Sequence, residues 1–176
     1  MATSTPTPPD ADSSPAVQTR HETLDTVAAQ IDAIDTLIGL ARHSIRVFDV
    51  DLSGIGWNNA GRAEKILAFL RATPKARLDI VVHDTGWIER SCPRLTGLLK
   101  VHGHVITVRR TGEDAKHAMD PLLIVDDQHY LHRLHVAKPR AVLGVAEPDG
   151  AKPLIERFAA IWSSAEPGLT ATVLGL

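Results

Sequence analysis

Residues 45–50 read IRVFDV, residues 77–83 read RLDIVVH and residues 104–108 read HVITV. Each run is short and rich in β-branched residues, which is typical of a buried strand. Helical patterns separate the runs. One follows Asn58 or Asn59 over residues 60–72, and another begins at Pro93 and ends at Gly103. Strands and helices that alternate at this spacing predict right-handed crossovers and a parallel sheet.

The sequence before these strands predicts one helix and one unstructured segment. Thr19 and Glu22 have the spacing of a capping box, and apolar residues follow at three- and four-residue steps from Leu24 to Ala41. This pattern predicts an amphipathic helix that opens at Thr19. Residues 1–18 contain mainly Pro, Ser, Thr and Asp. They cannot bury enough apolar surface to offset chain entropy, so we expect a disordered tail.

The pattern changes after the third strand. Residues 122–125, 128–134 and 141–145 read as short strands joined by tight turns, which predicts antiparallel pairing. A helix is predicted over residues 151–164 and a last strand over residues 170–174. The predicted fold class is therefore α/β, with a mixed β-sheet flanked by helices in one domain over residues 19–176.

Length and composition exclude several classes of protein. The chain has 176 residues, of which 44% are hydrophobic and 23% charged, as expected for one globular domain. Its longest apolar runs fall far short of the roughly 18 residues that span a bilayer. The N-terminus lacks the pattern of a secretory signal. Cys92 is the one cysteine and cannot form an internal disulfide, so we expect a cytoplasmic protein.

Charge is distributed unevenly along the chain. The net charge is −2, yet residues 61–140 carry fourteen Lys and Arg against nine Asp and Glu, together with seven of the nine histidines. Two interpretations are open. This segment either forms a face that attracts anions or is an ordinarily solvated surface.

Polar residues follow the predicted parallel strands, where ligands bind in open α/β sheets. The candidate ligand-binding residues are Asp49, Asp51, His83, Asp84, Arg109 and Arg110. Asp49 and Asp51 point the same way if both lie on a strand, and can then share a cation or an arginine. In the alternative, one of them caps the following turn while the other pairs with a base.

The order of elements and the segment Met119–Asp127 resemble one half of a phospholipase D-like domain. That superfamily reads His-x-Lys-x4-Asp, in which the histidine is the nucleophile and the lysine holds the phosphate. Aligning Asp126 puts Met119 and Pro121 in the other two positions, and aligning Asp127 instead puts Asp120 and Leu122 there. No histidine of the chain has a Lys or Arg two positions later, so the motif is absent.

The resemblance extends over residues 20–176 and fits best an uncharacterised bacterial group of degenerate phospholipase D-like domains. Further segments that carry it are residues 48–52, the pair His83-Asp84, and residues 158–162 with Glu166-Pro167. The resemblance implies Asp126 as a site residue and a homodimer as the assembly.

Other motifs give weaker signals. His102 and His104 have the spacing of metal ligands, but the first belongs to a helix end and the second starts a strand. His129, His132 and His135 would align on a helix, whereas a strand turns His132 to the face opposite His129 and His135. Cys92 lies near a helix start without an evident histidine partner, which favours a structural role. Trp57 and Trp87 either line the cleft or pack beneath a loop, whereas Trp162 is expected in the core. Residues 53–56 lack a phosphate-loop pattern, so no cofactor or metal is predicted.

These observations lead to a functional hypothesis with two alternatives. We expect a non-catalytic binding module for a phosphate-containing or other anionic ligand, held where His83, Asp84, Arg109, Arg110 and His117 meet. One alternative is a phosphodiesterase or nuclease with a rearranged site, in which His117 or His83 acts as nucleophile or base and Arg109 clamps the phosphate. The other is an accessory domain that depends on a partner enzyme.

Overall fold

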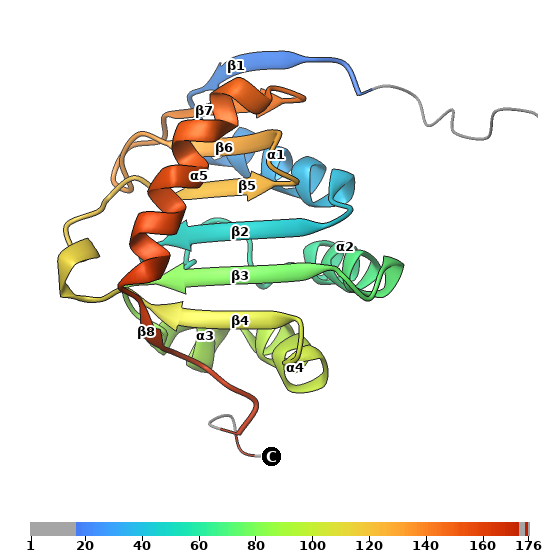
Figure 1. Cartoon of the computed structure of the whole chain (residues 1–176), viewed down its shortest axis with the longest axis vertical. Helices are drawn as coiled ribbons and strands as arrows, with labels where there is room; N and C mark the ends of the chain where they lie inside the picture. Colours follow the sequence, from blue (N-terminus) through green and yellow to red (C-terminus); the bar gives the residue numbers. More distant parts are fainter. Residues whose placement is uncertain (1–16, 173–174, 176) are drawn as a thin grey trace, which may run out of the picture.

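The chain folds around a single eight-stranded sheet (Figure 1). The computed structural model describes residues 17–172 and residue 175, so residues 1–16 of the predicted tail lie outside the described residues. The spatial order of the strands is β1-β7-β6-β5-β2-β3-β4-β8. Their bounds are β1 Arg20–Leu24, β2 Ser44–Asp49, β3 Arg77–Val82, β4 Ile106–Arg110, β5 Leu122–Val125, β6 His129–Arg133, β7 Ala141–Val145 and β8 Glu166–Pro167.

Parallel and antiparallel pairing divide the sheet as the sequence predicts. Strands β2, β3 and β4 are parallel neighbours, with Asp49 in register with Val82. Strands β5, β6 and β7 pair antiparallel, and β5 joins the two halves through an antiparallel pairing with β2. The predicted mixed α/β sheet is therefore confirmed.

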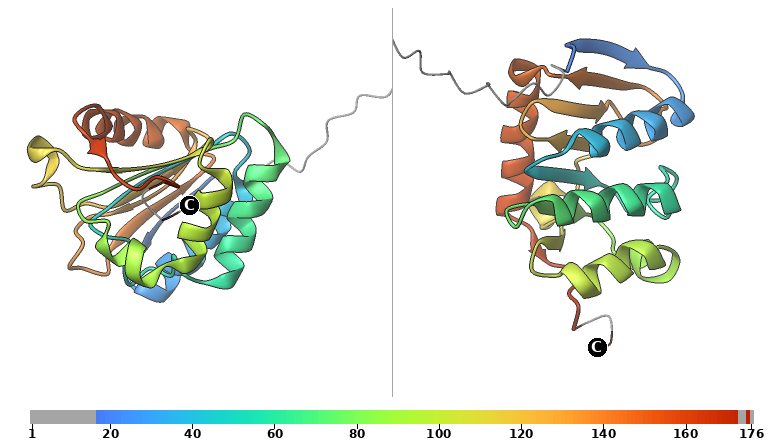
Figure 2. Two further views of the ribbon diagram at one scale, coloured as in Figure 1. Left: turned by 90° about the horizontal axis from the view of Figure 1, so that it is seen from below. Right: turned by 90° about the vertical axis from the view of Figure 1, so that its right-hand side faces the viewer.

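Helices cover both faces of the sheet (Figure 2). Helices α1, α2 and α4 lie on one face and α5 on the other. The helix bounds are α1 Val27–Leu40, α2 Ala60–Ala72, α3 Gly86–Ser91, α4 Pro93–His102 and α5 Pro148–Ser163, with a short 3-10 helix, η1, at Glu113–Ala115. The sequence pattern missed α3 and η1, which are only six and three residues long.

Successive side chains of a strand point to opposite faces of the sheet, and the apolar ones form a core on each face. Ile45 and Val47 of β2 pack in the larger core under α1, α2 and α4, whereas Phe48 packs in the smaller core under α5. The predicted start of α2 and end of α4 are confirmed, because Asn59 directly precedes α2 and Gly103 directly follows α4. Cys92 is fully buried in the larger core, and burial raises the pKa of its thiol, so it is a structural residue.

The predicted helix start at Thr19 is wrong. Residues 20–24 form β1, which pairs antiparallel with β7, from Arg20 opposite Val145 to Leu24 opposite Ala141. Helix α1 begins later, where the hydroxyl of Thr26 accepts a hydrogen bond from the Ala29 amide at 3.1 Å. A capping-box spacing is local information, whereas β1 depends on a partner strand more than a hundred residues away.

The predicted C-terminal strand is also wrong over its described part. Residues 170–172 form no strand, and residues 173–174 lie outside the described residues. The last strand is instead β8, where Glu166 and Pro167 pair with Arg110 and Arg109 of β4. Helix α5 begins at Pro148, three residues before the predicted start, because a proline is well placed in the first turn of a helix.

Candidate functional site

The predicted polar edge forms, but its residues turn to opposite faces of the sheet. Asp49 lines a small cavity with Ile34 of α1 on the α1–α2 face. The ring of His83 lies on the α5 face, edge-on to Phe48 with 5.4 Å between ring centroids. Asp49 and His83 therefore do not form one cleft.

His83 is held by hydrogen bonds from both ring nitrogens. Its Nδ1 lies 2.7 Å from the Thr111 hydroxyl, and its Nε2 lies 2.7 Å from the Ala118 carbonyl oxygen. Because a carbonyl oxygen can only accept, Nε2 carries the proton and the Thr111 hydroxyl donates to Nδ1. Neither nitrogen is available to attack a phosphorus atom in this arrangement.

The other candidate residues, at the carboxyl ends of β3 and β4, contact neighbouring elements. Asp84 accepts a hydrogen bond from the Gly86 amide at the start of α3 (2.9 Å). Arg109 donates to the Trp162 carbonyl (3.1 Å), and its guanidinium lies 4.8 Å from the centroid of the Trp162 ring, a cation–π contact. Arg110 pairs with Glu166 of β8 at 3.7 Å on the surface. These contacts anchor α3, α5 and β8 and do not converge on one point.

Asp49 and Asp51 have different partners, as in the alternative where one caps the turn and the other pairs with a base. Asp51 Oδ1 accepts hydrogen bonds from the Ser53 amide (2.9 Å) and hydroxyl (2.7 Å), which caps the turn after β2. Asp49 Oδ2 instead lies 3.9 Å from Nη1 of Arg133, at the end of β6. The two carboxylates thus share neither a cation nor an arginine.

Asp49, Trp57 and Arg133 form a buried polar cluster, which we call the Asp49–Arg133 cluster. They line a cavity of about 20 Å³ together with Pro121, and their exposed fractions are 2%, 2% and 8%. Burial is the main cause that raises the pKa of Asp49 to about 6, although the Val50 amide and Arg133 oppose it. Arg133 also donates from Nη2 to the Val136 carbonyl at 2.8 Å. The cavity is far too small for a phosphoryl group.

A second buried arginine fixes Trp57. Arg62 of α2 is fully buried and lies 5.5 Å from the centroid of the Trp57 ring. It donates to Asp35 Oδ1 at 2.6 Å and to carbonyl oxygens of residues 31 and 55. Trp57 therefore lies in the larger core, where it also lines the cavity of the Asp49–Arg133 cluster, and Trp87 packs half-buried against the same core.

Asp126 follows β5 and lies at the opposite end of the strands from the predicted cleft. Its carboxylate accepts hydrogen bonds from three successive backbone amides, those of Arg42 (2.7 Å), His43 (2.8 Å) and Ser44 (2.8 Å). These amides lie at the start of β2, whereas Asp49 ends it. Asp126 thus ties the β5–β6 turn to the start of β2 and stands apart from the other candidate ligand-binding residues.

His117 lines a surface groove that we call the His117 groove. This groove has a volume of about 210 Å³ and lies between the 111–120 loop and α5, and it is lined by Asp114, Ala115, His117, Ala118, Arg157, Ala160, Ile161 and Ser164. Arg157 donates from Nε to Asp120 Oδ2 at 2.6 Å and from Nη2 to Oδ1. His132 Nε2 lies 3.3 Å from the same Oδ2.

The charges beside the His117 groove are coupled. Burial raises the pKa of Asp120, but hydrogen bonds and charge from Arg157 and His132 outweigh it and hold this pKa below its ordinary value. The hydrogen bond to Asp120 in turn raises the pKa of Arg157. Arg157 is thus a fixed, permanently charged group on one wall of the groove.

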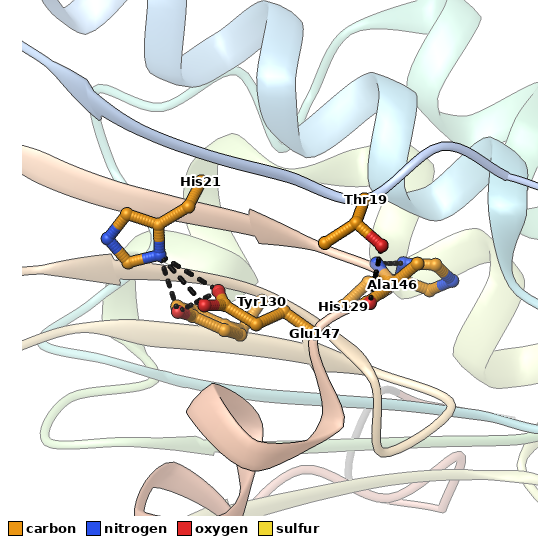
Figure 3. Close-up of polar contacts among 6 residues, drawn as sticks. All are labelled: Thr19, His21, His129, Tyr130, Ala146 and Glu147. Carbon is orange, nitrogen blue, oxygen red and sulfur yellow. Dashed lines mark hydrogen bonds and ion pairs between the residues drawn. The ribbon is translucent and has the colours of Figure 1, made fainter.

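The remaining histidines are distributed among separate contacts (Figure 3). His21 of β1 and the buried Tyr130 both contact Glu147, at 2.9 Å and 2.6 Å, and the hydrogen bond from His21 is the main cause that lowers the pKa of Glu147. His129 Nδ1 accepts from the Ala146 amide at 2.9 Å. His135 accepts from the Ala137 amide. Within residues 17–172 and 175, no group of three or more His, Cys, Asp or Glu could hold a metal ion.

The two positions where the resemblance requires a histidine and a lysine hold residues without those groups. Met119 is 39% exposed beside the 134–136 segment, where its carbonyl accepts from the Val136 amide at 2.7 Å. Pro121 lines the cavity of the Asp49–Arg133 cluster. Asp127, the alternative alignment for the motif aspartate, pairs with Arg46 on the surface.

Solved structures with the same architecture define the class of fold. The chain is similar to Nuc, a phospholipase D family member from Salmonella typhimurium, with a TM-score of 0.58, 14% identity, 87% of this chain covered and 100% of that chain. It is similar to NucT from Helicobacter pylori, with a TM-score of 0.56, 14% identity, and coverage of 86% and 100%. The fold is therefore phospholipase D-like. The chain belongs to the family described as Domain of unknown function (DUF7931), whose model matches residues 26–171.

The chain is also similar to part of a larger protein. TrmBL2, an archaeal chromatin protein, gives a TM-score of 0.63 at 13% identity, with 85% of this chain covered, and this chain spans 55% of the length of TrmBL2. A comparison with curated proteins finds no match. Within the described residues, no helix is long and apolar enough to cross a membrane.

Sequence reasoning missed the arginines that organise the site. Arg62, Arg133 and Arg157 lie in segments that read as ordinary helix or strand, and an isolated arginine there normally indicates solvent exposure. The one signal for Arg133 is that it follows Leu131 at a spacing of two in a strand, which places it on the same face as an apolar residue.

Proposed function

We propose that this chain is a non-catalytic phospholipase D-like module that acts by binding. The observation that carries the proposal is the pair Met119 and Pro121 at the positions of the nucleophile and the phosphate-holding cation, where Pro121 lines a small cavity with Asp49 and Arg133. A phosphohistidine mechanism needs an imidazole nucleophile and a cation that stabilises the phosphoryl charge. Neither a thioether nor a pyrrolidine ring supplies these groups.

The alternative of a phosphodiesterase with a rearranged site finds little support in the geometry. His83 is bonded at both ring nitrogens, and Arg109 is bound to Trp162 in the α5 region. His117 remains as a candidate base, but no hydrogen bond within the described residues orients its ring, and it lies on the α5 side away from the Asp49–Arg133 cluster.

The ligand we propose is a small phosphate-containing or other anionic molecule in the His117 groove. His117 is exposed there and makes no hydrogen bond or ion pair within the described part of the chain. Arg157 lines the same groove and pairs with Asp120 through Nε and Nη2, so Nη1 is the nitrogen left to meet a ligand. A fixed guanidinium and an exposed imidazole are groups that recognise phosphate oxygens.

Nucleic acid belongs among the candidate ligands. The similar protein TrmBL2 binds DNA, in a mode described as novel. The present chain has a net charge of −2 and lacks the strongly basic character of an electrostatic DNA binder. We therefore rank a small anion above a polynucleotide, and include a short oligonucleotide in the test.

A thermal-shift titration tests this proposal with inorganic phosphate, sulfate, a nucleoside monophosphate and a short oligonucleotide. A ligand at 100 times its Kd is expected to stabilise the folded chain by about 2.7 kcal/mol. The shift should largely disappear in His117→Ala and persist in His43→Ala, because His43 is an exposed histidine at the opposite edge of the sheet. Equal shifts in both variants, or none with any probe in the wild type, would contradict the binding proposal.

Two further expectations stay predictions. The resemblance implies a homodimer, and the single cysteine predicts a reducing, cytoplasmic location. Met119 and Leu134 are exposed apolar side chains near the carboxyl edge of β2, which supports a surface that a second copy would cover.

A further inference from the structure

The Asp49–Arg133 cluster contains buried polar atoms without a protein partner, on residues that line a common cavity. Among the described residues, these buried atoms are Asp49 Oδ2, Trp57 Nε1 and Arg133 Nε, and all three residues line the cavity. Asp49 Oδ2 lies 3.9 Å from Arg133 Nη1, which is too long for a hydrogen bond. Native proteins rarely leave buried polar groups unsatisfied, so three unpartnered atoms on residues that line one cavity indicate a bound partner.

Donor and acceptor counting selects the chemistry of that partner. Trp57 and Arg133 each present one N–H donor, and Asp49 Oδ2 presents an acceptor. An ammonium ion only donates and would leave both N–H groups unsatisfied. A halide ion only accepts and would lie against a carboxylate. Water accepts two hydrogen bonds and donates two, so it satisfies all three atoms.

We infer that one structural water occupies this cavity, where it accepts hydrogen bonds from Trp57 Nε1–H and Arg133 Nε–H and donates one to Asp49 Oδ2. The cavity volume of about 20 Å³ matches a single water.

The water site is independent of the His117 groove. It lies beside Pro121, where the resemblance expects the phosphate-holding lysine, and the two charged groups that flank it stand 3.9 Å apart, too far for a direct hydrogen bond. The water bridges the two charges, as internal waters do for buried polar groups that cannot meet directly.

Water–protein cross-relaxation in NMR tests the inference on the wild-type chain. The indole N–H of Trp57 should show a dipolar cross-peak to a long-lived water. In a rotating-frame experiment this cross-peak has the opposite sign to one that arises from hydrogen exchange, so the two can be told apart. The indole signal that is lost in Trp57→Phe is assigned to Trp57. Trp87→Phe is the matched control, in which the Trp57 signal and its water cross-peak should remain. Absence of the cross-peak at the Trp57 indole in the wild type would overturn the inference.

A crystal structure gives the second, independent reading. We expect a density peak within about 3.2 Å of Asp49 Oδ2, Trp57 Nε1 and Arg133 Nε. A crystal grown with bromide should show no anomalous signal there at neutral pH. A direct Asp49–Arg133 hydrogen bond without such a peak, or a bromide signal at the site, would overturn the assignment of water.

Discussion

Replacing Arg133 with alanine is expected to lower the free energy of unfolding by about 3–5 kcal/mol at pH 7.5, because it leaves a buried carboxylate without its counter-charge. Asp49 is only 2% exposed, and among the described residues Arg133 is the cation whose charge lowers the pKa of Asp49. The substitution also removes the hydrogen bond from Arg133 to the Val136 carbonyl. Urea unfolding of both proteins measures the difference.

The loss should depend on pH in a defined direction. The pKa of Asp49 is about 6 in the folded chain against an ordinary value of 3.8, so its protonated form stabilises the fold. This stabilisation is fully present below about pH 3.8 and is lost as the pH rises through about 6. Without Arg133 the carboxyl group will hold its proton more strongly, so the penalty should be smaller at pH 4.5 than at pH 7.5.

Arg140→Ala is the matched control for Arg133→Ala. Arg140 is an exposed arginine that faces an exposed Asp25 at 3.8 Å, so its loss should cost about 0–1 kcal/mol with little dependence on pH. Equal losses in the two variants, or a penalty at Arg133 that does not change with pH, would contradict the assignment of Asp49 and Arg133 as a buried ion pair.

Asp126→Ala is expected to lower the free energy of unfolding by about 3 kcal/mol, because three hydrogen bonds from backbone amides to a carboxylate are lost together. Asp127→Ala is a close control. Both residues have positive φ, 50° and 57°, so alanine introduces similar backbone strain at each. Asp127 pairs only with Arg46 at the surface, and its loss should cost about 0–1 kcal/mol beyond that strain.

The difference between these two variants decides the role of the surviving motif aspartate. A large loss at Asp126 alone identifies it as an anchor between the β5–β6 turn and β2. Losses of the same size at both positions would instead show that backbone strain in the turn, and not the amide contacts, determines the stability.

Local patterns in the sequence were sufficient for much of the fold. Three β-branched runs predict β2, β3 and β4, and the residue types of Asn59, Pro93 and Gly103 predict helix ends that the structure confirms. The start of α1 was wrong because β1 gains its hydrogen bonds from β7, a distant partner. A capping pattern carries no information about such pairing.

The candidate site was less predictable, for a geometric reason. The order of the parallel strands shows that Asp49 and His83 lie at the same ends of neighbouring strands. Which face of the sheet each side chain points to depends on its position along the strand, because successive side chains alternate between the two faces. Asp49 follows Val47 toward α1, whereas His83 follows Val81 toward α5. Arg133 reaches Asp49 only because β6 lies beyond β5 in the sheet, an arrangement that no local pattern contains.

The non-catalytic role is best tested by an assay of phosphodiester hydrolysis with an activated aryl phosphodiester, using wild type, His83→Ala and His117→Ala. Replacement of the motif histidine and lysine by Met119 and Pro121 predicts a rate equal to the protein-free reaction for all three proteins. Turnover by the wild type that disappears in His83→Ala or His117→Ala would contradict a non-catalytic role and establish a rearranged catalytic site.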